Sequence, residues 1–222
     1  MLKTFLTIGA GPGIGFATAR QFAKEGYHVA LASRNPVRLR KLAERLEAEG
    51  LSASVIQLDA SDPQAVGRVV ADIGHDLEVL HYNAAAFHFD EHGDVVTRPL
   101  ELETIQSLSS GIQTNVSSAL AAIHACLPAM KAKSAGTILL TGGGFGVSPV
   151  ADFLTLSVGK AGIRAIALAL FEPLKQQGIH IGTVTVSRGI SPNSKQAEEV
   201  AIEFWALHAQ QPDYWTVERV YT

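Results

Sequence analysis

The stretch Thr7–Gly15, with the sequence Thr-Ile-Gly-Ala-Gly-Pro-Gly-Ile-Gly, decides how this chain folds. An apolar run, Thr4–Leu6, precedes it, and a segment with apolar residues at helical spacing follows it. This order predicts a strand, a glycine turn and a helix. Glycine allows positive φ angles and lets the backbone approach a bound group closely. Because the N-terminus of a helix offers unpaired N–H groups and a positive dipole end, the turn suits the pyrophosphate of a dinucleotide.

Glycines also occur in ordinary loops, so the same stretch could be a plain turn between a strand and a helix. The spacing of Gly9, Gly13 and Gly15 also differs from the usual G-x-G-x-x-G pattern. The rest of the chain has to decide between these two interpretations.

Length and composition predict one domain that covers residues 1–222, because 222 residues with 47% hydrophobic content can build one substantial core. The net charge of -3 and the isoelectric point of about 6.2 give no basic stripe for nucleic acid. No uninterrupted apolar run reaches the roughly 18 residues of a membrane span, and Met1–Lys3 leaves no room for a signal peptide before the first strand. The lone Cys126 excludes an internal disulfide and fits a reducing compartment. We therefore expect a cytoplasmic protein that binds neither nucleic acid nor membrane.

Strand-like and helix-like segments alternate along the whole chain. Strands are expected at 4–6, 27–32, 54–58, 77–82, 137–141, 179–186 and 217–221, and helices after the glycine turn, at 36–49, from 63 to about 73, from 99, and at 115–131, 155–177 and 196–209. Asn35–Pro36 and Asp62–Pro63 are typical helix starts, and Pro173 should kink or shorten the helix at 155–177. This alternation predicts a single doubly wound α/β domain of Rossmann type, with a mostly parallel, seven-stranded sheet and helices on both faces.

Right-handed crossovers place the C-terminal ends of parallel strands at one edge of the sheet. The glycine turn, Ser33–Arg34, Asp59–Ala60 and Asn83–Ala85 all follow strands, so they should meet at this edge. Their agreement favours the dinucleotide site over a plain turn.

These features resemble the short-chain dehydrogenase/reductase family over almost the whole chain. The turn is similar to the family's TGxxxGxG, with Ile8 at the Thr position, and the family's NNAG is Tyr82–Ala85 here. Asn115–Val116, Lys160 and Gly189 also stand in the family's order. The resemblance implies a cofactor site made of Gly9, Gly11, Gly13, Ile14, Gly15, Ser33, Arg34, Asp59, Ala60, Asn83, Ala84, Ala85, Lys160, Gly189 and Ile190. It also implies a homodimer or homotetramer formed through the helices around 115–131 and 155–177.

The residues after the second strand favour NADP over NAD. An Asp there would bind the adenosine ribose of NAD and repel a 2′-phosphate. The chain instead has Ser33 and Arg34, whose hydroxyl and guanidinium suit a phosphate. Alternatively, Arg34 is a solvated surface charge or only stacks on the adenine.

The family's catalytic pattern is incomplete in this chain. The family uses a Tyr four residues before the Lys to transfer the proton, and a Ser one strand earlier to polarise the carbonyl. Leu156 stands at the Tyr position, and Gly143, within Gly142–Gly144, stands at the Ser position. Thr155 and Ser157 are turned about 100° away from Leu156 on a helix and are weak acids.

Two catalytic candidates remain, Lys160 and Asn115. Lys160 could donate the proton if burial lowered its pKa, or it could only hold the nicotinamide ribose. The resemblance implies that Asn115 holds a water beside Lys160. The sequence therefore predicts an NADP(H)-dependent oxidoreductase for a small carbonyl or alcohol with non-standard acid–base residues. The alternative is a catalytically silent NADP(H)-binding protein that acts as a sensor, scaffold or regulatory subunit.

Two further segments carry weaker signals. Phe87–Val96 contains His88, His92 and three carboxylates, but their spacing fits no metal pattern, so we expect a solvated loop and no metal. In the C-terminal region we expect Trp205 and Trp215 to pack and His208 to lie at the surface.

Overall fold

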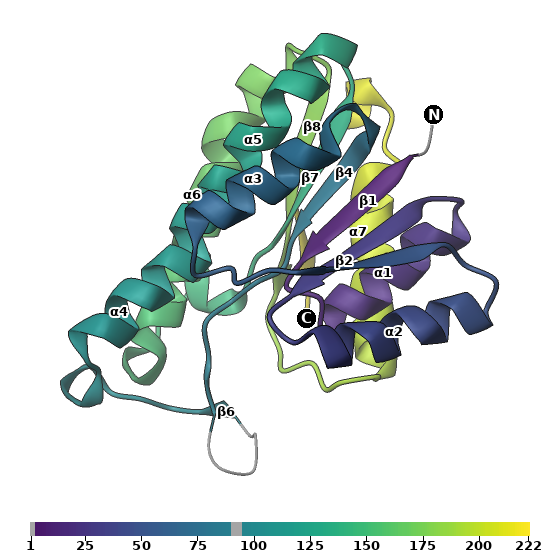
Figure 1. Cartoon of the computed structure of the whole chain (residues 1–222). Helices are drawn as coiled ribbons and strands as arrows, with labels where there is room; N and C mark the ends of the chain where they lie inside the picture. Colours follow the sequence, from purple (N-terminus) through teal and green to yellow (C-terminus); the bar gives the residue numbers. More distant parts are fainter. Residues whose placement is uncertain (1–2, 90–94) are drawn as a thin grey trace.

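A seven-stranded parallel sheet forms the centre of the chain in a computed structural model, which describes residues 3–89 and 95–222 (Figure 1). The strand order is β3-β2-β1-β4-β7-β8-β9, and every neighbouring pair is parallel. The strands are β1 (Thr4–Ile8), β2 (His28–Ser33), β3 (Ala53–Gln57), β4 (Leu77–Tyr82), β7 (Gly136–Thr141), β8 (Ile179–Val186) and β9 (Glu218–Tyr221). The predicted Rossmann-type α/β fold is confirmed.

Helices cover both faces of this sheet (Figure 1). One face carries α1 (Ile14–Lys24), α2 (Pro36–Ala48) and α7 (Lys195–His208); the other carries α3 (Pro63–Ile73), α5 (Ser118–Lys133) and α6 (Leu154–Lys175). The short α4 (Ile105–Ile112) lies beyond the strand ends, against the first part of α6. The predicted caps form, since Asn35 accepts from Arg38 N and Asp62 accepts from Gln64 N and Ala65 N.

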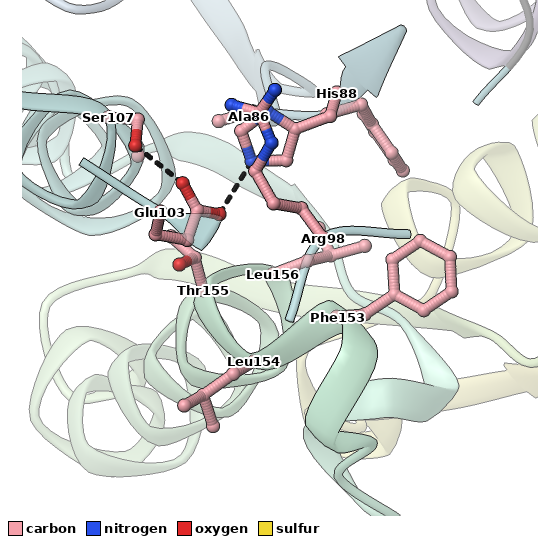
Figure 2. A pocket seen from close by; sticks show the side chains of 11 residues that line it. Ala86, His88, Arg98, Glu103, Ser107, Phe153, Leu154, Thr155 and Leu156 are labelled. Atoms are coloured by element: carbon pink, nitrogen blue, oxygen red, sulfur yellow. Dashed lines mark hydrogen bonds and ion pairs between the residues drawn. The ribbon is translucent and has the colours of Figure 1, made fainter. Parts of the chain in front are cut away.

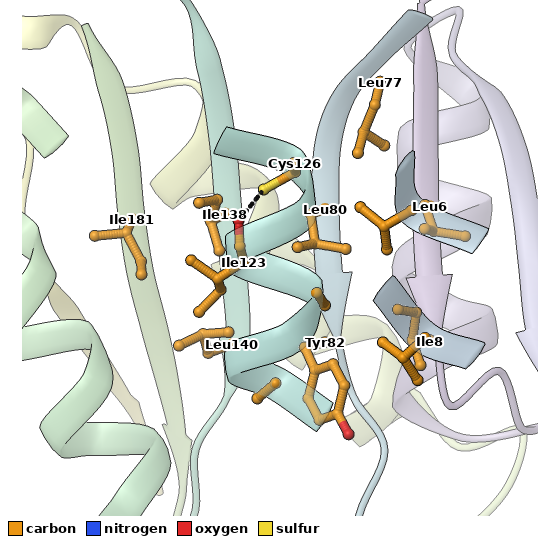
Figure 3. Close-up of a cluster of buried hydrophobic side chains, with 14 of the residues drawn as sticks. Leu6, Ile8, Leu77, Leu80, Tyr82, Ile123, Cys126, Ile138, Leu140 and Ile181 are labelled. Carbon is orange, nitrogen blue, oxygen red and sulfur yellow. Dashed lines mark hydrogen bonds between the residues drawn. The ribbon is translucent and has the colours of Figure 1, made fainter. Parts of the chain in front are cut away.

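Two apolar layers hold the helices to the sheet, because successive strand residues point to opposite faces. Leu6 and Ile8 of β1 belong to the layer under α3, α5 and α6 (Figure 3). Phe5 belongs to the other layer, where its ring stacks on Phe22 of α1 at 4.3 Å. Burial on both faces explains why these strands are almost uninterrupted apolar runs. Cys126 is buried in the first layer.

The segment between β4 and α5 departs from the prediction. The segment expected to be a solvated loop contains a short antiparallel pair, β5 (His88–Phe89) and β6 (Val95–Val96). Asp90, Glu91, His92 and Asp94 lie outside the described residues. The helix expected from Pro99 starts only at Ile105, after a 3₁₀ turn at Leu100–Leu102, because Thr104 and Ser107 form a capping box there. The helix expected from Asn115 begins with a π-helical turn at Gln113–Ser117.

Helix α6 also differs from expectation in two respects. Pro173 does not end it, since the helix continues to Lys175. The stretch Ala151–Lys175 is long and apolar enough, by length and composition, to cross a membrane. The sequence prediction did not include this stretch, because polar residues interrupt its apolar ones. Buried core helices pass the same test, and α6 packs on the sheet through Ile163, Ile166 and Ala167.

The two tryptophans pack, as expected, but the prediction for His208 was wrong. Trp205 makes an edge contact with Phe22, and Trp215 stacks on His180. His208 is half-buried instead of lying free at the surface, and it bonds to Tyr27 Oη at 2.8 Å and Thr137 Oγ1 at 2.9 Å. Burial lowers the pKa of His208 to about 4.

Candidate functional site

The glycine turn between β1 and α1 contains two kinds of glycine. At Gly9, φ is +93° and a Cβ would lie 2.4 Å from Ala84 N, so this position admits no side chain. At Gly11 and Gly13, a Cβ would meet nothing within 4 Å. Gly13 begins α1 without any side-chain cap from the described residues. The turn therefore presents open backbone beside the positive end of a helix.

Three other segments converge on this turn, as the topology predicts. The N–H groups of Gly9 and Ala10 donate to Ala32 O at the end of β2. Asn83, after β4, donates from Nδ2 to Gly9 O at 2.8 Å. Ile190, in the segment after β8, packs against the same apolar layer as Ala10. The edge of the sheet thus brings together most of the residues predicted to bind a cofactor.

Ser33 and Arg34 lie beside Asp59 at the far side of this edge. The side chain of Arg34 is exposed after the last residue of β2. The Asp59 carboxylate accepts from Ser61 N and Ser61 Oγ, both at 2.9 Å. The backbone hydrogen bond from Ser61 is the main cause that holds the pKa of Asp59 below its ordinary value, and the Arg34 charge contributes. Ala60, the next residue in the chain, packs on the apolar layer under α3, α5 and α6.

Lys160, on α6, is buried and reaches the end of β7. Its Nζ donates to Thr141 O at 2.7 Å. Burial lowers its pKa to about 8. The glycines after β7 fit closely around it: a Cβ at Gly143 would lie 3.1 Å from Lys160 Cγ, and one at Gly146 would lie 2.5 Å from Lys160 C. These glycines therefore allow the backbone after β7 to lie against the lysine.

Asn115 is held in the π-helical turn, which is a feature often found at functional sites. Its Oδ1 accepts from Ala86 N at 2.8 Å, and its side chain lies over Gly159, where a Cβ would be 2.5 Å from Asn115 Cβ. Its Nδ2 is buried without a hydrogen-bond partner in the described parts of the chain. Because a buried unpaired donor costs about 1–3 kcal/mol, this amide is suited to hold a water or a ligand.

A chain of polar side chains, the buried Thr7, His81 and Thr141 and the half-buried Asn83, connects the glycine turn with Lys160. Thr7 Oγ1 lies 3.1 Å from His81 Nδ1, and His81 Nε2 lies 3.0 Å from Thr141 Oγ1. Thr141 Oγ1 donates to Asn83 Oδ1 at 2.8 Å. Since that hydroxyl proton is used, His81 must donate from Nε2, so a neutral ring accepts at Nδ1 from Thr7 Oγ1. Burial agrees with this and lowers the pKa of His81 to about 3.

The sequence reasoning did not identify this polar chain. A histidine and two threonines within apolar strands were the available signal. Their pairing depends on the register Thr7↔His81 between β1 and β4, which only the fold provides.

A small cavity of about 30 Å³ lies beside Leu156 (Figure 2). Its described lining includes Ala86, His88, Arg98, Glu103, Ser107, Thr155 and Leu156. His88 Nε2 lies 2.6 Å from Glu103 Oε1, and Ser107 Oγ donates to Glu103 Oε2 at 2.5 Å. The sequence singled out His88 only as a possible metal ligand and missed Glu103, because their pairing needs α4 to fold back on the segment after β4. The described residues contain no group of three His, Cys, Asp or Glu side chains that could hold a metal.

A scan of family models matches residues 3–199 to the short chain dehydrogenase family. The chain belongs to this family of oxidoreductases. It is 26% identical to the 3-dehydrosphinganine reductase TSC10B of Arabidopsis thaliana over 80% of its length and 52% of that protein's. It is 31% identical to a very-long-chain 3-oxoacyl-CoA reductase of Laccaria bicolor over 82% of its length and 54% of that protein's. The chain thus spans about half the length of these curated relatives.

Solved structures show the same fold. A short-chain dehydrogenase from Rhodopseudomonas palustris superposes with a TM-score of 0.86 at 25% identity, covering 99% of this chain and 97% of that one. A metagenomic short-chain oxidoreductase in complex with NADP superposes with a TM-score of 0.85 at 24% identity, covering 99% of this chain and 96% of that one.

The residues at this edge of the sheet fit a dinucleotide. Gly11 and Gly13 leave the space that a side chain would otherwise fill, and α1 offers its N-terminus beside them. The buried Nδ2 of Asn115 offers a donor without a partner among the described residues. Which residues touch a cofactor stays a prediction.

Proposed function

We propose that the chain is an NADP(H)-dependent oxidoreductase that interconverts a carbonyl compound and an alcohol. The observation that carries this proposal is the open backbone at Gly11 and Gly13, beside the N-terminus of α1 and on the same sheet edge as Lys160. The names of both curated relatives describe reductases of oxo or dehydro compounds, which supports a carbonyl substrate.

NADP is preferred over NAD because of the residues after β2. Ser33 and the exposed Arg34 offer a hydroxyl and a guanidinium where a 2′-phosphate would lie. Asp59 stands near enough to Arg34 for its pKa to respond to that charge. A 2′-phosphate bound by Arg34 would therefore also lie near the Asp59 carboxylate.

The bound nicotinamide would supply or accept a hydride, and the chain's own residues would position the reacting groups. Lys160, anchored on Thr141 O, would bind the ribose hydroxyls and keep a positive charge beside the site. Its pKa of about 8 also leaves it able to exchange a proton near neutral pH. Asn115 would hold a water through its Nδ2.

One pair of substitutions tests the proposed cofactor site. Gly11→Ala adds a methyl group to open space, so the variant should melt like the parent but bind NADPH at least about tenfold more weakly, in a fluorescence titration. Gly67→Ala on α3, where the nearest atom to the new Cβ would lie 4.0 Å away, is the matched control and should bind like the parent. If the parent does not bind NADPH, or if Gly11→Ala binds it equally well, the proposed site is wrong.

A second function, a catalytically silent NADP(H)-binding protein, is favoured by Leu156 and Gly143. We infer that these residues stand where the family has its Tyr and Ser. The deciding variant is Leu156→Tyr combined with Gly143→Ser. The new Ser Cβ would approach Lys160 Cγ to 3.1 Å, which the flexible lysine stem can relieve by moving a few tenths of an ångström. Turnover that appears only in the double variant supports the silent protein, and turnover by the parent excludes it.

We also propose a homodimer or homotetramer in the cytoplasm. Leu120 on α5 and Val158 and Leu168 on α6 are 45–48% exposed, which supports association through these helices. The lone Cys126 supports a reducing compartment. Light scattering after gel filtration tests the first point, with a monomeric mass contradicting it. Localisation of a tagged chain tests the second.

A further inference from the structure

Leu156 has no group that could exchange a proton with the substrate. An ionisable pair, His88 and Glu103, lines the same cavity as Leu156. Leu156 lies one helical turn before Lys160 and lines the cavity with an apolar side chain. His88, Arg98 and Glu103 are the charged or ionisable residues among those that line it (Figure 2). They come from the segment after β4 and the segment before α4, which close the cavity opposite α6.

Glu103 is arranged as an anionic partner for His88. Its side chain is 4% exposed, while that of His88 is 31% exposed. Burial alone would raise the pKa of Glu103, but hydrogen bonds from Ser107 and His88 and the charges of His88 and Arg98 outweigh burial and lower it. The carboxylate is therefore ionised at neutral pH and can only accept hydrogen bonds.

This pairing fixes the ring of His88. Since Glu103 Oε1 accepts at 2.6 Å, His88 Nε2 carries a hydrogen, and Nδ1 is the ring nitrogen that can gain or lose a proton. A base held by a carboxylate beside a cavity is the arrangement used in many proton-transferring sites. The partial exposure of His88 gives the ring access to water for the return of the proton.

We propose that His88, positioned by Glu103, exchanges the proton with the reacting oxygen in place of a group at position 156. This inference rests on the proposed function. In the direction of reduction, the carbonyl carbon receives a hydride, which carries both electrons, from the reduced nicotinamide. The carbonyl oxygen receives the proton from Nδ1 of protonated His88, so the C=O bond becomes CH–OH. The neutral ring then recovers a proton from water.

A purely structural role is the alternative, in which the pair only fixes the segment after β4 against α4. Both roles would make Glu103 important for stability. Only the catalytic role requires that His88 affect turnover while NADPH binding and the melting temperature stay unchanged.

The kinetic test uses the full-length protein with NADPH and three probe carbonyls: ethyl acetoacetate, diacetyl and 4-nitrobenzaldehyde. His88→Gln should lower kcat at least about 100-fold, as expected for loss of general acid catalysis, with an unchanged NADPH Kd. Added imidazole should restore part of the activity of His88→Ala. Leu156→Tyr should also restore activity in that background, because it returns a phenol to the same cavity. Ser157→Ala, which removes a hydroxyl that bonds to Val150 instead of lining the cavity, is the matched control and should keep the parent kcat.

The second readout needs neither cofactor nor substrate. Nitrogen NMR of the His88 ring, recorded at a pH high enough for the ring to be neutral, should show hydrogen on Nε2 in the parent, and Glu103→Gln should weaken that preference. A neutral parent ring with hydrogen on Nδ1 would overturn the proposal whatever the kinetics, and so would a kcat of His88→Gln within threefold of the parent. That kinetic result would leave the proposed function intact. Absence of NADPH binding defeats the proposed function itself, and binding without turnover of any probe defeats this inference and supports the silent protein.

Discussion

The buried histidine His81 makes a specific prediction about acid stability. Its ring is fully buried, and its pKa is lowered to about 3 from an ordinary 6.5 because burial disfavours the charged form. Between these two pH values the unfolded chain binds a proton at this site and the folded chain does not. The free energy of unfolding therefore falls as the pH decreases through this window, by about 1.4 kcal/mol per pH unit.

At pH 4.5, two units below the ordinary pKa, the loss due to His81 is about 2.7 kcal/mol relative to pH 8. Because pH 4.5 lies above the folded-state pKa, the size of the loss depends almost entirely on the pKa of the unfolded chain. A domain with about 5–15 kcal/mol of total stability should show this loss clearly. His208, with a pKa lowered to about 4, adds a similar loss, so the parent alone does not isolate His81.

The assay compares urea unfolding of the parent and of His81→Val combined with Thr7→Val at pH 8 and pH 4.5. The double variant removes both members of one hydrogen bond, so neither polar atom is left unpaired. Thr141 Oγ1 keeps its bond to Asn83 in that variant. The stability difference between parent and variant should shift by about 2.7 kcal/mol in favour of the variant at pH 4.5. Thr7→Val alone keeps the His81 ring, so its stability should fall between pH 8 and pH 4.5 as the parent's does. If the stability difference between the parent and the double variant stays the same at the two pH values within about 0.5 kcal/mol, the reasoning is refuted.

Three further predictions follow from single side chains. Arg34→Ala should weaken NADPH binding at least about tenfold and leave NADH binding nearly unchanged, since only NADPH carries the 2′-phosphate; equal effects on both would contradict the NADP preference. Cys126, whose pKa burial raises to about 12, should resist Ellman's reagent in the folded protein and react once urea unfolds it; rapid reaction of the folded protein would show that the thiol is accessible. Lys160→Met should raise the melting temperature at pH 7, because it removes a buried ammonium whose pKa of about 8 lies below the ordinary 10.5, yet weaken NADPH binding. Buried Lys160 should also destabilise the fold less as the pH rises from 8 to 10.5, because in this range the unfolded chain binds a proton at Lys160 that the folded chain does not. A melting temperature of Lys160→Met below the parent's at pH 7 would contradict this account.

The architecture could be predicted from the sequence because its signals are local. Each strand is a short apolar run, and Gly26, Gly50, Gly74 and Gly178 all adopt the positive φ values that a chain reversal after a helix requires. The caps at Asn35 and Asp62 involve residues only two or three positions apart. Once alternating strands and helices are recognised, the rule for right-handed crossovers places the glycine turn, Ser33–Arg34, Asp59–Ala60 and Asn83–Ala85 at one edge without further information.

The details of the candidate site escaped prediction because they depend on contacts between distant segments. The pairing of His88 with Glu103 is decided by where α4 begins, and that in turn by the capping box at Thr104 and Ser107, which overrides the proline signal at Pro99. The π-helical turn that holds Asn115 has no sequence pattern of its own.

The catalytic pattern of the family is incomplete in the order of residues along this chain, and that order does not show which distant side chains lie together in space. Position 156 was judged by the residue that it carries, yet proton transfer requires an ionisable atom at a place in space, and any segment that borders that place can provide it. His88 and Glu103 also line the cavity beside Leu156, so a proton donor at this cavity would not have to come from α6. Under the proposal for His88, turnover would therefore depend less on Leu156 than on the His88 ring, which lines the same cavity.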